Sequence, residues 1–446
     1  MAQGHCICLL NDSFPPVIDG VANAVLNYAR HIQESHGRAL VATPAYPGAD
    51  DSAYPFPVLR YPSIDTRRLV GYVAGFPFSP ELLSRLRTEK TELLHSHCPV
   101  ASTLLARECR NVLNIPLVFT YHTKFDIDIA KAVKSTLMQE GAIRALVQNI
   151  NACDEVWVVS RGAGDNLRSL GYTGDYAVME NGVDVPRARV PEAAVEAAAA
   201  GFDLPAGVPV FLFVGRLMWY KGIRIILDAL ASLRAAGTDF RMVFIGDGAD
   251  GTEIRAYTEE LGLSDRCFFT GSLQDRDVIR AWYCRADLFL FPSTFDTNGL
   301  VVREAAACSL ASVLIAGSCA AEGVTDGKNG YLIREDAASL AARLTELCRE
   351  PGGMRAVGEG AARDLYISWG DAVARAADRY GAVIDRYRSG GYARRIRPGD
   401  ELLRAHGELM DILGRVEEQG EELEQRIEQR LMKSLIGRVS GRFRRS

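Results

Sequence analysis

The sequence lacks long hydrophobic runs, and it has no strong excess of charge of either sign. No apolar stretch is long enough to span a bilayer. The first residues lead into the apolar segment HCICLL without the basic and cleavable apolar parts of a secretory signal. The formal net charge of −5 at pH 7 gives no indication of nucleic-acid binding. We therefore expect a globular cytoplasmic protein that binds no nucleic acid.

The sequence also lacks clustered cysteines. Its ten cysteines are scattered, mostly through apolar segments, which is typical of reduced, buried thiols. The runs Cys6-Ile7-Cys8 and His95-Ser96-His97-Cys98 contain metal-ligating residue types, but neither has a second cluster at the spacing of a zinc site. We therefore expect no structural metal and no cofactor.

What the sequence does contain is an alternation of strand-like and helix-like segments, which predicts the α/β class with parallel sheets. At 446 residues the chain is too long for one hydrophobic core. The strands predicted in the first half are Cys6–Leu10, Ala39–Thr43, Glu92–Ser96, Leu117–Tyr121, Glu155–Ser160 and Tyr176–Met179. The helices predicted there are Val21–Ser35, Ser79–Glu89, Ala101–Leu113 and Gly162–Leu170.

A second series of the same kind follows a polar, alanine-rich connector near residues 187–204. Its predicted strands are Val208–Val214, Arg241–Ile245, Cys267–Thr270, Leu288–Phe291, Ser312–Ile315 and Gly330–Ile333. Its predicted helices are Gly222–Ala236, Gly251–Leu261, Arg276–Arg285, Leu300–Cys308 and Ala337–Arg349. Two Rossmann-like sheets of similar size would face each other across a cleft. Because such sheets bind ligands beyond the carboxyl ends of their strands, we expect the site in that cleft.

The segment FPSTFDTNGLVVREAAA is the most informative in the chain. A buried strand ends at its start and a helix begins near Leu300, so Asp296 lies on the loop and Glu304 about one turn inside the helix. Between them, the Asn298-Gly299 turn leads to a helix N-terminus, whose free N–H groups and dipole suit an anion. Acids around an anion site suit a ligand with hydroxyls beside its phosphates, as in a nucleotide sugar.

Three further loops at predicted strand ends carry candidate residues. Arg216 and Lys221 follow one strand, where they would grip phosphate oxygens or would be two surface cations beside a helix start. Gly20 opens a helix and would let phosphate approach the backbone, or it belongs to a plain strand-to-helix turn. His122 follows a third strand, as a site residue or as a packed or solvated histidine.

Two other motifs compete with this interpretation. Gly246–Gly251, GDGADG, fits the dinucleotide fingerprint after a strand. Its aspartates, Asp247 and Asp250, would repel a pyrophosphate, so the loop around Gly248 is expected to accommodate a nucleotide base or to be a simple turn. Asp126-Ile127-Asp128 resembles a metal motif of another class of sugar transferases, but nothing around it supports that fold.

Together and in this order, the motifs resemble those of the family 4 glycosyltransferases, retaining enzymes of the GT-B fold. The resemblance covers roughly residues 7–387. It implies a first, acceptor-side domain over residues 1–185 with a returning helix at 368–388, and a donor-binding domain over 186–367. The matching positions are Gly20, Tyr121-His122-Thr123, Glu180-Asn181-Gly182-Val183-Asp184, Arg216, Lys221, Asp296, Glu304, Glu322, Asp326, Gly330 and Ser368-Trp369.

The resemblance implies a metal-independent, retaining transfer of a hexose, with uridine diphosphate glucose as the expected donor. The cationic pair and the N–H groups after Asn298 would stabilise the departing diphosphate, Glu304 would hold the ribose, and His122 would position the hexose. The residues expected to act in catalysis are Arg216, Lys221, His122 and Asp296. The expected donor-binding residues are Gly20, Arg216, Lys221, Gly248, Asp296, Asn298, Gly299, Leu300 and Glu304.

The chain departs from the family pattern at four positions. Asp296 is one methylene shorter than the usual glutamate, and Asn298 replaces a residue that is often apolar. Ser309 and Ala311 stand where glycine and proline are common. These departures leave open which sugar the site holds.

The last part of the chain, residues 389–446, predicts a helical extension. Its apolar residues recur in a short, imperfect coiled-coil pattern, which would allow self-association. The final sixteen residues, LMKSLIGRVSGRFRRS, carry five cations and no acid. They form either an amphipathic helix for an anionic membrane surface or a basic, solvated end. The coiled-coil positions are Leu402, Leu409, Leu413, Val416, Leu423 and Ile427, interrupted by His406 and Gly420.

The family includes enzymes that glycosylate diacylglycerol and related lipids, in which Tyr121-His122-Thr123 also occurs. The resemblance therefore implies a membrane lipid as acceptor, with the tail holding the enzyme at the inner face of the cell membrane. Three alternatives remain open: a transferase for a soluble or cell-wall polysaccharide, a nucleotide-sugar epimerase on the same fold, and a non-catalytic coiled-coil scaffold.

Overall fold

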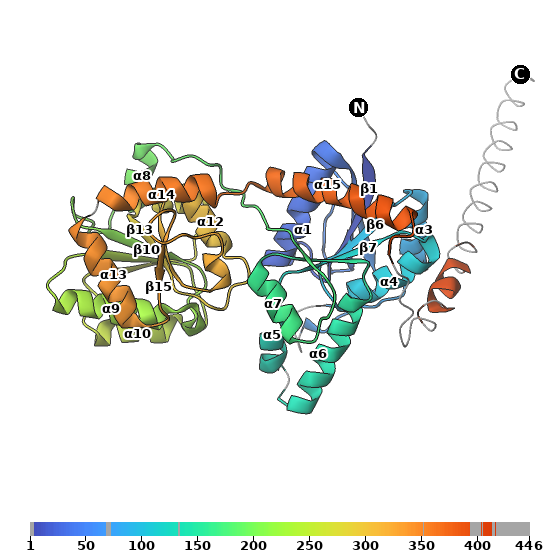
Figure 1. Cartoon of the computed structure of the whole chain (residues 1–446), viewed down its shortest axis with the longest axis horizontal. Helices are drawn as coiled ribbons and strands as arrows, with labels where there is room; N and C mark the ends of the chain where they lie inside the picture. Colours follow the sequence, from blue (N-terminus) through green and yellow to red (C-terminus); the bar gives the residue numbers. More distant parts are fainter. Residues whose placement is uncertain are drawn as a thin grey trace, which may run out of the picture.

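The computed structural model describes residues 4–67, 73–132, 134–350, 352–392, 403, 405–412 and 415. It contains two α/β bodies side by side, as Figure 1 shows. The predicted α/β class with two parallel-sheet domains is confirmed. Among the described residues, no helix combines the length and the apolar character that crossing a bilayer requires.

The first domain contains a seven-stranded parallel sheet in the order β3-β2-β1-β6-β7-β8-β9. Its strands β1, β2, β6 and β7 are mostly apolar runs buried on both faces, as is usual in parallel sheets. The strands are β1 (His5–Leu10), β2 (Gly37–Pro44), β3 (Val58–Tyr61), β6 (Leu93–Ser96), β7 (Leu117–Tyr121), β8 (Glu155–Val158) and β9 (Ala177–Val178). The helices are α1 (Gly20–His31), which continues into a π-helical turn (Ile32–His36), α3 (Pro80–Thr88), α4 (Ala101–Leu113), α5 (Phe125–Ala132), α6 (Thr136–Asn151) and α7 (Arg161–Ser169).

The second domain contains a six-stranded parallel sheet in the order β12-β11-β10-β13-β14-β15. Three of its strands, β11 (Arg241–Ile245), β13 (Leu288–Phe291) and β14 (Ser312–Ile315), have the predicted bounds. The others are β10 (Val210–Val214), β12 (Cys267–Gly271) and β15 (Tyr331–Ile333). The helices are α8 (Glu192–Ala199), α9 (Ile223–Ala235), α10 (Gly251–Glu260), α11 (Arg276–Arg285), α12 (Leu300–Ala307), α13 (Ala337–Arg349) and α14 (Gly352–Asp364).

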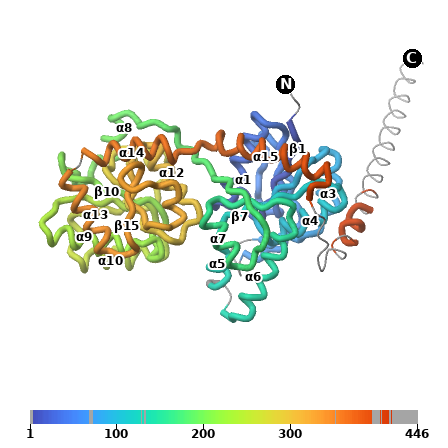
Figure 2. Tube along the Cα trace, in the orientation of Figure 1, coloured from blue at the N-terminus to red at the C-terminus, as the bar shows by residue number. Residues whose placement is uncertain are grey.

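The chain crosses between the domains twice, and the two crossings lie next to each other (Figure 2). Val183 on the outgoing segment pairs with Ser368 on the returning one, and the Val183 N–H donates to the Ile367 carbonyl over 3.0 Å. The returning helix α15 (Trp369–Arg388) packs its apolar face, which includes Trp369 and Tyr380, into the core of the first domain. The chain thus returns to the first domain through α15.

Several elements were missing from the sequence prediction. The two antiparallel strands β4 (Ser63–Ile64) and β5 (Ala74–Gly75) have two residues each and are too short to give a pattern, and the edge strand β3 is only partly buried except at Tyr61. Helix α6 has 16 residues but buries only Val147, Asn149 and Ile150, so it has no clear apolar stripe. Helix α8 lies in the segment read as a connector, and α14 is rich in glycine, which pattern rules count against a helix.

Part of the C-terminal extension docks on the first domain. Residues 405–412 are helical, and Met410 is fully buried among the core residues of that domain. His406 contacts Glu108 of α4 at 2.6 Å, and Asp411 pairs with Arg87 of α3. The coiled-coil positions Leu402, Leu413, Val416, Leu423 and Ile427, and the basic end, lie outside the described residues.

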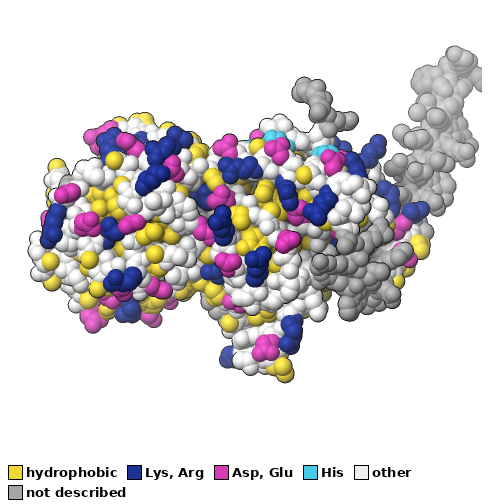
Figure 3. Space-filling model, viewed as in Figure 1, with side chains coloured by type: hydrophobic (Ala, Val, Ile, Leu, Met, Phe, Trp, Pro, Cys, Tyr) yellow, Lys and Arg dark blue, Asp and Glu magenta, His cyan; other side chains and the backbone are white. Residues whose placement is uncertain are grey.

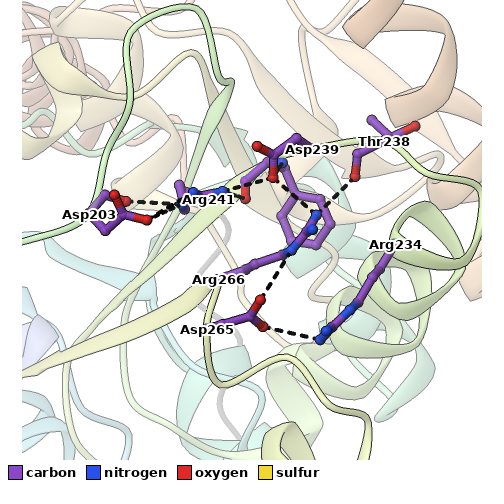
Figure 4. A network of polar contacts seen from close by, with 8 residues as sticks. Asp203, Arg234, Thr238, Asp239, Arg241, Asp265 and Arg266 are labelled. Atoms are coloured by element: carbon purple, nitrogen blue, oxygen red, sulfur yellow. Dashed lines mark hydrogen bonds and ion pairs between the residues drawn. The ribbon is translucent and has the colours of Figure 1, made fainter.

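A network of ion pairs closes the amino-terminal edge of the second sheet, as Figure 4 shows. Arg241 at the start of β11 contacts Asp203 at 2.9 Å and Asp239 at 2.8 Å, and Arg266 lies 3.0 Å from Asp239. Arg234 pairs with Asp265 at 3.1 Å. Because these charges lie at the opposite edge from the carboxyl ends of the strands, the network ties loops together there and is separate from the candidate site.

Candidate functional site

The loops at the carboxyl ends of the two sheets contact each other directly. The Thr297 hydroxyl donates to the His122 carbonyl over 2.6 Å, and the Ser160 hydroxyl donates to the Thr297 carbonyl over 2.5 Å. Lys124 Nζ reaches the Thr294 carbonyl at 3.1 Å. The segment 293–298 of the second domain therefore lies against the ends of β7 and β8 of the first.

Lys221 lies buried at this contact, in a turn (Trp219–Lys221) between β10 and α9. The turn ends at Gly222, which has φ +77°, and a Cβ there would lie 2.0 Å from the Pro292 carbonyl oxygen. Glycine is required because two loops approach so closely. The approach brings Lys221 Nζ to 2.5 Å from Asp296 Oδ1, and Nζ lies 5.7 Å from the ring centres of Tyr220, Phe291 and Phe295.

The loop that carries Asp296 is ordered by a local hydrogen bond. The Ser293 hydroxyl donates to Asp296 Oδ2 over 2.6 Å, which fixes the second oxygen of the carboxylate that binds Lys221. Asn298 is only 9% exposed, and its Nδ2 has no hydrogen-bond partner among the described residues. Gly299 precedes α12 in the left-handed region, and no described side chain caps that helix. Amide donors at Asn298 and at the start of α12 are thus available to a ligand.

Glu304 is placed one turn inside α12, as predicted. Burial raises the pKa of its carboxyl group, opposed by the Tyr283 hydroxyl, which donates to Oε2 over 3.0 Å. Neighbouring Arg303 points elsewhere: it donates to the Leu365 carbonyl at 2.9 Å and to Glu180 at 2.5 Å. Among the described residues, Oε1 of Glu304 therefore has no hydrogen-bond partner.

Arg216 and Gly248 lie on two adjoining loops. Arg216 follows β10 and is exposed, with no hydrogen bond or ion pair to another described residue. The Leu217 N–H donates to the Asp247 carbonyl at 3.0 Å, and a Cβ on Gly248 would lie 2.4 Å from the Leu217 carbonyl oxygen. Asp250 accepts from the Trp219 N–H at 2.8 Å. Packing between these loops therefore explains the glycines of GDGADG without a dinucleotide.

Gly20 is the first residue of α1, where a Cβ would meet no atom within 4 Å. The Asp19 carboxylate caps this helix by accepting from the Val21 and Ala22 N–H groups at 2.8 and 2.7 Å, and it also accepts from the Ser13 hydroxyl. Asp19 therefore holds two of the N–H donors that a phosphate could use in the first turn of α1.

His122 lies at the end of β7, where it is 7% exposed. Burial lowers its pKa to about 3, so the imidazole is neutral at physiological pH. Its Nε2 lies 2.8 Å from Nδ1 of His97, which sequence reasoning considered only as a metal ligand. Among the described residues, no group of three or more His, Cys, Asp or Glu side chains is arranged to hold a metal ion.

A second interdomain contact was not predicted. Glu322, one of the positions that match the family pattern, accepts from the Arg161 and Gly162 N–H groups at 2.8 and 2.6 Å. One domain thus caps the first turn of α7 in the other. No local sequence pattern predicts this contact, because it depends on how the two domains meet.

A cavity of about 360 Å³, lined by residues such as Arg110, Tyr172 and Arg379, lies at the amino-terminal edge of the first sheet and contains none of the predicted site residues.

Comparison with known proteins identifies the family. The profile described as Glycosyl transferases group 1 matches residues 195–364, and the profile described as Glycosyltransferase Family 4 matches residues 18–187. D-inositol 3-phosphate glycosyltransferase from Mycolicibacterium smegmatis is 31% identical over 330 residues, which are 68% of this chain and 71% of that protein. Alpha-monoglucosyldiacylglycerol synthase from Streptococcus pneumoniae is 22% identical over 306 residues, 68% of this chain and 69% of that protein.

The fold agrees with that of solved structures. The crystal structure of Anabaena HepE in complex with UDP superposes with a TM-score of 0.66 at 20% identity, covering 84% of this chain and 99% of that one. At this identity the likeness shows the fold alone, which is the GT-B arrangement expected from the motifs. The two profiles and the 31% identical relative show that this chain belongs to the family 4 glycosyltransferases.

Proposed function

We propose that this enzyme moves a hexose, glucose, from a uridine diphosphate sugar to a membrane lipid such as diacylglycerol, with retention and without a metal ion. The proposed binding of the nucleotide sugar is supported mainly by the buried polar groups around Asn298. Its unpartnered Nδ2 and the uncapped start of α12 adjoin the acid that binds Lys221. Together they offer donors and a cation to a diphosphate.

The chemistry follows from these charges. Breaking the anomeric C–O bond leaves negative charge on the departing diphosphate, and Lys221, Arg216 and the N–H groups after Asn298 would stabilise it. These cations supply the charge that a divalent ion would otherwise supply. The ribose hydroxyls would bind Glu304. The acceptor would attack on the face that the diphosphate leaves, and a diphosphate oxygen would take its proton, so the anomeric configuration is retained.

The lipid acceptor is supported by exposed apolar side chains on the first domain. They lie on segments that follow the carboxyl ends of β1, β3, β6 and β7, the edge of the sheet that carries His122. Two of them, Leu137 and Met138, lie where α6 begins. This part of the chain is at the lower end of the molecule in Figure 3, where hydrophobic and charged side chains are seen together. These side chains belong to Ile18, Ile64, Phe76, Val100, Leu137 and Met138.

The comparisons support two acceptor classes. The pneumococcal relative is named for a diacylglycerol product, which favours the lipid. The 31% identical relative is named for D-inositol 3-phosphate, which favours a second candidate, a soluble polyol phosphate acceptor. Under the first candidate the enzyme would lie in the cytoplasm, peripheral at the inner face of the membrane.

Incubation with acceptors and a panel of nucleotide sugars tests the proposal. The purified chain is mixed with radiolabelled uridine, guanosine and adenosine diphosphate hexoses, each with a total lipid extract or with inositol phosphate. We expect label from the uridine diphosphate glucose in the lipid phase, with an α-linkage by NMR. Label in the polyol alone would support the second candidate, and conversion of the donor without acceptor would indicate an epimerase. No turnover of any donor would refute the proposed function.

A further inference from the structure

Three buried histidines lie in a row beneath the interdomain contact. His95 is in β6, His97 follows that strand, and His122 follows the neighbouring strand β7. The ring centres of His95 and His97 are 4.0 Å apart, and those of His97 and His122 are 5.1 Å apart and stacked. His97 thus lies between His95, which is buried inside the domain, and His122, which lies at the candidate site.

His95 is held from both sides by other elements. Its Nδ1 lies 2.6 Å from the Tyr380 hydroxyl on α15, and its Nε2 lies 2.7 Å from the Thr120 hydroxyl on β7. Its two ring nitrogens are therefore both used for packing the returning helix against the sheet. His97 takes no part in these bonds, and its Nδ1 is directed at Nε2 of His122 over 2.8 Å.

The direction of the His97–His122 hydrogen bond follows from the atoms around it. Burial keeps both rings neutral, because it lowers the pKa of each, so one ring donates and the other accepts. Nε2 of His97 is buried without a hydrogen-bond partner among the described residues. A buried N–H without a partner is rarer than a buried acceptor without one. The proton of His97 therefore belongs on Nδ1, where it has a partner.

We infer that His97 is a positioning residue for the transfer reaction: its Nδ1–H donates to Nε2 of His122 and leaves His122 with its own proton on Nδ1, as a donor for a hydroxyl of the hexose. This inference rests on the proposed function, in which His122 contacts the donor hexose. In the described residues Nδ1 of His122 has no hydrogen-bond partner, and the Thr297 hydroxyl holds its backbone beside the Asp296–Asn298 loop. His97 thus selects the tautomer, as outer partners of site histidines commonly do.

Substitutions at position 97 separate this role from packing. His97→Phe keeps a ring of similar size and removes the donor, whereas His97→Asn keeps an N–H close to the position of Nδ1. We expect His97→Phe to lower kcat by about ten- to hundredfold, the range typical of losing the outer hydrogen-bond partner of a metal-ligating residue. UDP affinity, measured by calorimetry, should be unchanged. His97→Asn should recover most of the rate.

Tyr28→Phe is the matched control. The Tyr28 ring contacts the His97 ring edge-on at 5.6 Å, and its buried hydroxyl has no partner among the described residues, so its removal tests packing alone. We expect near-normal kcat. Equal losses of kcat in Tyr28→Phe and His97→Phe, or normal turnover in His97→Phe, would overturn the role of His97.

The tautomer can be measured on the wild-type chain without any turnover. In ¹⁵N-histidine-labelled protein, we expect His122 to be protonated on Nδ1, with Nε2 at the chemical shift of an acceptor. Protonation of His122 on Nε2 would overturn the inference. Because this measurement needs no substrate, it stays decisive if position-97 variants fail to fold or if the proposed transfer itself is not observed.

Discussion

The ammonium group of Lys221 lies 2.5 Å from Asp296 Oδ1, although the two residues are 75 positions apart in the sequence. Lys221, the cation expected to bind the diphosphate, is thus already paired with Asp296, the first of the two acids in the segment FPSTFDTNGLVVREAAA. The two groups form one preorganised pair, in which the Ser293 hydroxyl fixes the other carboxylate oxygen. Under the proposed function, a diphosphate that entered beside this pair would meet a cation held in place and would need little further ordering.

Lys221→Ala should abolish transfer while leaving the fold intact. Removing a preorganised donor of this kind typically costs about 3 kcal/mol of barrier, so we expect activity below about one per cent of wild type. Initial rates with saturating donor measure this, and a thermal melt reports on folding. Lys328→Ala, on an exposed turn of the same domain, is the matched control and should keep full activity. Near-normal turnover of Lys221→Ala would remove Lys221 from the site.

Gly162→Ala should weaken the contact between the domains. A Cβ at this position would lie 2.6 Å from Cys319 Sγ and 3.3 Å from Glu322 Oε1, and both belong to the other domain. Overpacking of this kind costs about 1–3 kcal/mol. The contacting arrangement should become about five- to 150-fold less populated, with a similar fall in kcat/KM and a larger radius of gyration by X-ray scattering.

The control for that substitution is Gly141→Ala in α6, where a Cβ would meet no atom within 4 Å. This change should leave activity unchanged and stabilise the helix slightly, because alanine is the better helix former. A Gly162→Ala variant with normal kcat/KM and an unchanged radius of gyration would show that Glu322 and α7 need not meet during catalysis.

Removal of residues 416–446 should weaken binding to an anionic membrane. The tail has five cations after Arg430, and each basic side chain near such a surface contributes about 1 kcal/mol. Ending the chain at Arg415 keeps Met410 in the core of the first domain. We expect the shortened chain to lose most of its sedimentation with phosphatidylglycerol vesicles. Equal binding of both chains would move the membrane contact to the exposed apolar side chains of the first domain.

The sequence predicted those parts of the fold whose burial leaves a clear pattern. Strands such as Leu288–Phe291 and Ser312–Ile315 are buried on both faces, so their continuous apolar runs gave the observed bounds. Helix α6 was missed because few of its residues are buried. Lys221 and Asp296 could be placed at one sheet edge because both follow strand ends. The contacts of Thr297 with His122 and of Glu322 with α7 could not be predicted, because they depend on how two separately folded sheets meet.

Glu108 should make the stability of the first domain depend on pH. This α4 carboxyl group is 2% exposed, with Oε1 2.6 Å from His406 and Oε2 without a partner among the described residues. Burial raises its pKa to about 7, opposed by His406 and Arg107. Below its unfolded pKa of about 4.5 the group is protonated in both states, so its ionisation does not affect the free energy of unfolding. As the pH rises towards 7, Glu108 loses its proton in the unfolded state first. The free energy of unfolding therefore falls by up to about 3 kcal/mol.

Glu108→Gln removes that ionisation and keeps the shape of the side chain. The variant should therefore become more stable relative to wild type as the pH rises from 5 to 8, with the difference in free energy of unfolding growing by up to about 3 kcal/mol. Urea unfolding at a series of pH values measures it. Glu140→Gln, which changes an exposed carboxylate paired with Arg144 at 3.7 Å, should show a difference that is flat with pH. A flat difference for Glu108→Gln as well would mean that the docked segment around His406 leaves Glu108 ionised at little cost, and that the helix 405–412 is held by Met410 and not by this pair.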